Sequence, residues 1–325
     1  MADQDFVLAP ATATVSVSIA LEPAFNVLNS LMLLSHPEER SGFSSWVNET
    51  AAKLSPELAR RHQLIFNMLF HGIEPLESWP SFPAYVDHMA TLDAESLRDR
   101  AVQWMCEKEL EGIAPLDKDR LLNDRSAYVH YLEQIYNQKW EKEVPFDTSF
   151  YEEAHNLLQD AELLKSTFVN HLRQMWTEVM KPEWERTLPM LQESVDAFQQ
   201  LDYGQMTALE AVRVVTGRDF RGIWDEWGKE VIFIPSPHIG PYLTRFDDEA
   251  NGLTRVVFGA RLPEGARVSS PALSRSELLV RLSALADDTR LQILELLTQH
   301  DELCAQDMIE MLDLSQSAAS RHLRQ

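Results

Sequence analysis

The chain has 325 residues, of which 45% are hydrophobic and 25% are charged, and its formal net charge is −22. This length and composition predict two folded domains and exclude an intrinsically disordered chain. No apolar run approaches the roughly 18 residues of a membrane span, the N-terminus is acidic where a secretory signal is basic, and only two cysteines occur, Cys106 and Cys304. We therefore expect a cytoplasmic protein without membrane partners and without a disulfide framework.

The first predicted element is a strand, and a mainly helical region follows it. Residues 12–20 alternate small or polar residues with β-branched ones, as a half-buried strand does. The helical period of the apolar residues then predicts helices over 22–34, 56–70, 94–110, 119–139, 150–200 and 207–217. Pro182 and Pro189 should kink or break the longest of these helices.

Two further strands are expected near the end of this region. Residues 229–236 and 253–262 are rich in β-branched and aromatic side chains, and the loop between them contains the run PSPHIGP. Together with residues 12–20 they predict a small sheet whose first strand is remote in sequence. The Pro-, Gly- and Ser-rich residues 262–274 predict a linker.

These elements predict a mainly α protein with a small β-sheet. We expect a large helical α+β N-terminal domain over residues 1–265 and a helix-turn-helix domain over residues 272–325. All eight tryptophans lie before the linker, so the two regions differ in composition as well as in pattern.

The last fifty residues have the pattern of a helix-turn-helix. Helices are predicted over 275–286, 286–297 and 303–312, and the buried side of the second is expected to consist of Leu291, Ile293, Leu294 and Leu297. A turn at Asp313–Leu314 follows, and Ser315 is a suitable N-cap for a last helix.

One face of this last helix suits a DNA major groove. Ala319 and Leu323, four residues apart, point inward, and the opposite face consists of Gln316, Ser317, Ser320, Arg321 and Arg324. Short serines allow close approach, glutamine can pair with adenine, and arginine can reach guanine or a phosphate. These five residues are the candidate DNA-binding residues.

The charge distribution limits how the chain can bind DNA. Residues 271–325 contain five arginines and nine acids, a net charge of −4, which leaves −18 for residues 1–270. DNA phosphates are repelled by so acidic a surface. Binding must therefore be local, and three of the five arginines, at 290, 321 and 324, lie in the last candidate DNA-facing elements.

The runs LSALADDTRLQILELL and ELCAQDMIEMLDLSQSAASRHLRQ resemble the winged helix-turn-helix of ArsR-type (arsenic-repressor-like) bacterial regulators. The family's Leu-Ala-Asp-Pro-Thr-Arg pattern has Asp288 in place of its proline here. The residues before the linker, with the PSPHIGP loop, are similar to the large N-terminal extension that some of these regulators carry. The resemblance implies a homodimer that binds a double-stranded DNA operator and is not an enzyme.

The resemblance also implies elements beyond the recognition helix. In this family a two-stranded wing and a last helix follow it, and the residues up to Gln325 include neither. We therefore expect that the sequence represents a shortened chain.

No metal or other cofactor is expected. Metal-sensing members of the family use a Cys-Val-Cys pair before the recognition helix, because thiolates suit soft metals, whereas this chain has Cys304-Ala305-Gln306. The i, i+3 pairs His130/Glu133 and Glu152/His155 have a spacing that can supply metal ligands, but such pairs are common on solvated helix faces.

A small organic effector is the expected signal. The tryptophans before the linker suit a pocket for an organic molecule, with Trp224, Trp227 and His238 as candidate contacts and ordinary core packing as the alternative. A competing interpretation is a protein-interaction or enzymatic N-terminal domain whose terminal helices serve packing only. The sequence contains no Gly-rich phosphate loop, nucleophile elbow or HExxH motif.

Overall fold

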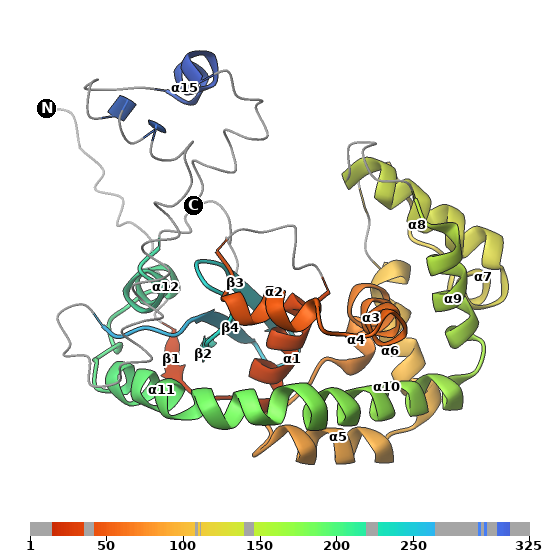
Figure 1. The fold of residues 1–325 in the computed structure, drawn as a ribbon, viewed down its shortest axis with the longest axis horizontal. Helices are drawn as coiled ribbons and strands as arrows, with labels where there is room; N and C mark the ends of the chain where they lie inside the picture. Colours follow the sequence, from red (N-terminus) through yellow and green to blue (C-terminus); the bar gives the residue numbers. More distant parts are fainter. Residues whose placement is uncertain are drawn as a thin grey trace, which may run out of the picture. The chain divides into compact units, whose positions relative to one another are not determined.

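The structure, a computed structural model, describes residues 15–35, 42–107, 110, 112–139, 146–218, 227–263, 292–293, 296–297 and 304–312. It is mainly helical with a small four-stranded sheet, as the sequence predicts (Figure 1). No helix among the described residues is long and apolar enough to cross a membrane.

The chain divides into two compact units. One contains Met1–Leu21, Glu38–Trp46 and Thr187–Gln325, and the other contains Glu22–Pro37 and Val47–Arg186. The first unit holds the sheet, and the second is helical. The expected linker over 262–274 lies almost entirely outside the described residues, so the domain boundaries at 265 and 272 stay a prediction.

The helices of the described chain can be followed in Figure 1. In chain order up to residue 199 they are α1 (Pro23–Leu33), α2 (Ser45–Ala51), α3 (Pro56–Gln63), the π-helix η1 (Leu64–Met68), α4 (Phe70–Ile73), α5 (Phe82–Thr91), α6 (Ala94–Glu107), α7 (Lys118–Asn123), α8 (Arg125–Lys139), α9 (Thr148–Leu158), α10 (Ala161–Met175), the π-helix η2 (Trp176–Met180) and α11 (Lys181–Gln199). Side-chain caps open several of them: Ser55 accepts a bond from the Leu58 amide, and Asp160 accepts one from the Leu163 amide. Helix α10 packs against α5 and α6 and buries Phe168.

The expected helices over 22–34, 94–110 and 207–217 are confirmed, whereas 119–139 is two helices that separate at Asp124. The predicted break at Pro182 or Pro189 is wrong, because both prolines lie inside α11 and the chain breaks instead at Gln159–Asp160; the predicted kink stays a prediction. The π-helix η2 ends at Met180, two residues before Pro182, and its wider turn accommodates a residue that lacks an N–H. Pro189 lies on the exposed side of α11.

The sheet has the strand order β1-β2-β4-β3. Strands β1 (Ser16–Ile19), β2 (Glu230–Ser236) and β4 (Leu253–Gly259) are parallel, and β3 (Leu243–Asp248) runs antiparallel to β4. The predicted sheet with a first strand remote in sequence is thus confirmed. Strand β3 corrects the expectation that the residues between 236 and 253 form only a loop, since its apolar positions are diluted by charges on an edge strand.

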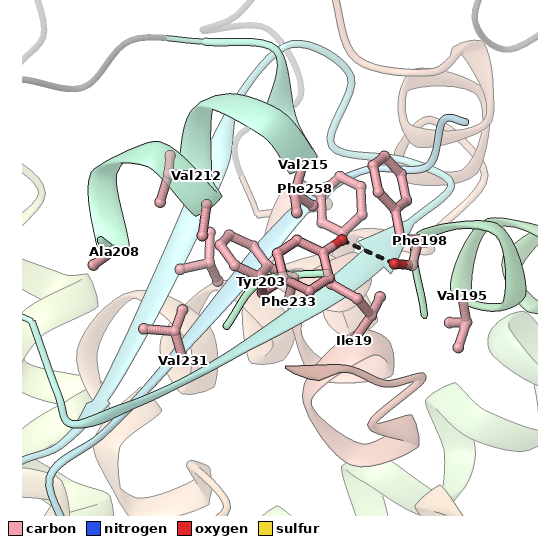
Figure 2. Packing of buried hydrophobic residues seen from close by; sticks show 12 residues of the cluster. Ile19, Val195, Phe198, Tyr203, Ala208, Val212, Val215, Val231, Phe233 and Phe258 are labelled. Carbon is pink, nitrogen blue, oxygen red and sulfur yellow. Dashed lines mark hydrogen bonds between the residues drawn. The ribbon is translucent and has the colours of Figure 1, made fainter. Parts of the chain in front are cut away.

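One face of the sheet is covered by the main core of its unit. Val231 and Phe233 of β2 and Phe258 of β4 pack with residues of α11 and of α12 (Ala208–Thr216), as Figure 2 shows. Val256 of β4 belongs to the same cluster. Tyr203 lies in the same cluster, and its hydroxyl donates to the Phe198 carbonyl over 2.9 Å.

Candidate functional site

Helix α15 (Ala305–Leu312) is the described helix nearest to the candidate DNA-binding residues, and it confirms the helix expected over 303–312. It begins after Cys304, whose backbone N–H donates to Asp307 Oδ2 over 2.8 Å. Hydrogen bonds from the side chain and backbone of Cys304 hold the pKa of Asp307 below its ordinary value. Cys304 is exposed and its contact is that of a helix start. Among the described residues no group of three or more His, Cys, Asp or Glu side chains is placed to hold a metal ion.

The tail has a buried and an exposed set of apolar side chains. Ile293 and Met308 are buried, as a packed helix-turn-helix requires. Leu297 is 44% exposed, so the prediction that it is buried is wrong, and Met311 is 47% exposed. Leu291 and Leu294 lie outside the described residues.

The five candidate DNA-binding residues also lie outside the described residues. Helix α15 ends at Leu312, directly before the predicted turn at Asp313–Leu314. The DNA-binding face formed by Gln316, Ser317, Ser320, Arg321 and Arg324 therefore stays a prediction.

Trp227, one of the candidate effector contacts, lies just before β2 and packs against the core of the sheet. The Arg245 guanidinium lies 5.1 Å from the centre of its ring, within the range of a cation–π contact. Arg245 also donates from Nε to Asp247 Oδ1 over 2.7 Å, and the Thr254 hydroxyl donates to the same oxygen over 2.9 Å. Trp227 thus forms one side of a partly buried polar cluster on the sheet.

His238, the second described candidate, is buried and stacks on Trp46 with ring centres 4.1 Å apart. The Ser44 amide donates to its carbonyl over 3.2 Å, which ties the PSPHIGP loop to residues 42–46. Trp227 precedes β2 and His238 follows it, and the two side chains have different recorded neighbours, Arg245 and Trp46. Trp224 lies outside the described residues.

The helical unit contains a buried histidine pair that the sequence did not indicate. His62 Nδ1 lies 3.0 Å from His171 Nε2, and His62 Nε2 lies 2.8 Å from the Leu31 carbonyl. Arg61 donates from Nε to His171 Nδ1 over 3.3 Å. The groups at the two ends of this series of hydrogen bonds fix both histidine tautomers, because a carbonyl only accepts and a guanidinium only donates. Each histidine is therefore neutral, with its proton on Nε2.

The surroundings of this pair favour the neutral form as well. Burial lowers the pKa of His62 to about 4. Burial, with the neighbouring His62 and Arg61, lowers the pKa of His171 to about 2. The pair joins α3 to α10. Because the two histidines are 109 residues apart in sequence, only their position among apolar helix residues could have suggested that they pair. Of the spaced pairs expected from sequence, His130 and Glu133 are exposed and 3.7 Å apart, as on a solvated helix face.

Comparison with known families identifies the tail. A model of the family described as "Bacterial regulatory protein, arsR family" matches residues 287–325. No curated protein and no solved structure matches the chain. Residues 287–325 therefore match an ArsR-family helix-turn-helix domain, which indicates a DNA-binding transcriptional regulator.

Proposed function

We propose that the protein is an ArsR-type transcriptional regulator that acts as a cytoplasmic homodimer on a double-stranded DNA operator. The observation that carries this proposal is the family match over residues 287–325, which includes α15 and all five candidate DNA-binding positions. Gln316 and Arg321 read base edges, Ser317 and Ser320 allow the helix to approach the groove, and Arg324 contacts the phosphate backbone.

Substitution within the predicted recognition helix tests this assignment. Operators recovered by selection from genomic DNA are titrated with purified protein in gel-shift assays. Gln316→Ala and Arg321→Ala should each weaken operator binding by about 1–3 kcal/mol, because each removes a contact to a base. Lys53→Ala, an exposed position in the helical unit, removes the same charge as Arg321→Ala and should leave the affinity unchanged. Unaltered binding by the Gln316/Arg321 double variant would show that another element reads the DNA.

We further propose that the residues before the linker bind a small organic effector. A helix-turn-helix needs only about fifty residues, and every tryptophan lies before residue 262. The partly buried surface of Trp227 beside Arg245 offers an aromatic and a cationic contact. An effector changes DNA affinity only if it binds the DNA-competent and incompetent arrangements unequally, and the linker over 262–274 connects the sheet to the tail.

A ligand screen separates this proposal from metal sensing. Tryptophan fluorescence and thermal shift are recorded with a library of organic compounds and, in parallel, with Zn, Ni, Cu and arsenite. An organic ligand should stabilise the wild type and shift its operator affinity. Stabilisation by a metal alone, lost in Cys304→Ser, would contradict the organic effector and indicate a metal sensor.

A further inference from the structure

The two edge strands of the described sheet differ in their protection against pairing. Strand β3, LTRFDD, carries Arg245, Asp247 and Asp248, and charges on an edge strand discourage the addition of another strand. Strand β1, SVSI, carries no charge, proline or glycine. The edge at β1 therefore lacks the charges by which β3 discourages pairing, although its four residues make it a very short edge strand.

The hydrogen bonds of β1 show which backbone groups face this open edge. The amides of Ser16 and Ala20 donate inward to the carbonyls of Lys229 and Phe233. Because alternate residues of a strand bond in opposite directions, the N–H and C=O groups of Val17 and Ile19 point outward. Gln199 Nε2 donates to the Ile19 carbonyl over 2.9 Å on that side, and a carbonyl oxygen can accept a second bond. No other described residue bonds to this outer side.

An open groove of about 440 Å³ runs along the same edge. Residues 15–19 line one side of it, and Gln199, Leu201, Tyr203 and Gly204 line the other. None of these residues is charged. In a chain with a net charge of −22, an uncharged surface is where a second copy meets the least repulsion.

We propose that β1 pairs antiparallel with β1 of a second copy, around a two-fold axis at Val17. The outward groups of Val17 bond to Val17 of the second copy, and those of Val15 and Ile19 bond crosswise, because both lie two residues from the axis. The uncharged sequence VSVSI is thus complementary to itself, and the two sheets become one. This inference rests on the proposed homodimer and assigns its interface.

A proline substitution at the axis tests this pairing. Val17→Pro removes an N–H that does not bond to β2, and proline is tolerated on the free side of an edge strand. Val17→Thr is the matched control, because threonine keeps both the N–H and the β-branched shape. By light scattering during size exclusion without DNA, the wild type and Val17→Thr should have the mass of two chains and Val17→Pro that of one.

Hydrogen exchange on the wild type tests the same pairing without a substitution. The amides of Val17 and Ile19 should be protected at high protein concentration and lose this protection on dilution, whereas those of Ser16 and Ser18 stay protected at both concentrations. A wild type of one-chain mass, a folded Val17→Pro of two-chain mass, or exchange at Val17 that is independent of concentration would each overturn the inference. If Val17→Pro fails to fold, the exchange result decides.

The operator titration keeps this inference separate from the proposed function. A dimer that depends on β1 but binds no DNA would contradict the regulator and leave the interface standing. If Val17→Pro keeps both the operator affinity and the dimer mass of the wild type, the interface is contradicted and the proposed regulator function is unaffected.

Discussion

Only the neutral forms of His62 and His171 fit the interior of the helical unit. The hydrogen bonds from Arg61 through both rings to the Leu31 carbonyl run in one direction, and every ring nitrogen has a partner. A proton added to His62 Nδ1 would face the N–H of His171 that already donates to it. A proton added to His171 Nδ1 would face the Arg61 guanidinium. The folded protein therefore disfavours the charged form of both histidines.

The pair should make the stability of the protein fall in mild acid. The pKa values of about 4 for His62 and about 2 for His171 lie below the value of about 6.5 for a free histidine. As the pH falls below 6.5 the unfolded chain takes up these protons first, so the free energy of unfolding declines toward pH 4 and, for His171, beyond. Urea unfolding at pH 7.5 and pH 5 measures this decline. His171→Gln, which cannot titrate, should reduce it, and His130→Gln, at an exposed position, should leave it unchanged.

Truncation of the same residue should be costly at neutral pH. His171→Ala leaves His62 Nδ1 and Arg61 Nε without their partner, although Arg61 still donates to Gln174, and opens a cavity beside Phe66. We expect a loss of about 2–4 kcal/mol in the free energy of unfolding. His130→Ala should change it by less than about 0.5 kcal/mol, because that side chain is exposed. Equal losses from the two variants would mean that the buried chain of hydrogen bonds contributes nothing.

At the scale of elements, the local sequence pattern predicted those helices and strands whose ends and periodicity depend on neighbouring residues. The capping box of Thr207 and Glu210 begins α12, and the helical period marks its length. The alternation in residues 12–20 and the β-branched runs of β2 and β4 gave three strands of the sheet. Strand β3 was missed, because Arg245, Asp247 and Asp248 hide its alternation and its place depends on pairing with β4.

The candidate sites depend on contacts that local pattern does not contain. His238 and Trp227 are both near β2, but only the structure shows that one stacks on Trp46 and the other lies against Arg245. His62 and His171 were overlooked as a pair because α3 and α10 bring together residues 109 positions apart. Composition can suggest which residue types suit a site, whereas their grouping is a property of the packed elements.

The PSPHIGP loop should be sensitive to a single methyl group. Gly240 has a φ of 59°, and a Cβ there would collide with the backbone carbonyl of Gly42, which cannot move aside as a flexible side chain can. Gly240→Ala should therefore lower the free energy of unfolding by about 3 kcal/mol or more. Gly112, with a φ of 74° and its nearest neighbour 3.7 Å away, is the matched control, and Gly112→Ala should cost only about 1 kcal/mol. Thermal and urea unfolding of both variants give the comparison, and similar losses would show that the loop can yield.

At the scale of the whole molecule, an acidic protein carries a DNA-binding tail. The charge of −18 on residues 1–270 repels the operator, so the arginines of the tail must supply the phosphate contacts. Strong non-specific binding is therefore not expected. The operator must be held by a few contacts whose number the salt dependence can report.

The salt dependence of operator binding should be shallow for a dimeric regulator. Arg321 is assigned to a base edge, so Arg290 and Arg324 of each copy allow about four phosphate contacts per dimer, and the slope of log affinity against log salt should be no steeper than about −4. Arg324→Ala removes one contact per copy and should make the slope shallower by about 2. Fluorescence anisotropy with labelled operator between roughly 50 and 200 mM salt measures both slopes. Lys53→Ala, an exposed cation of the helical unit, should leave the slope unaltered. A wild-type slope near −10, or one that Lys53→Ala reduces, would place phosphate contacts on the acidic part of the chain and contradict a purely local DNA-binding face.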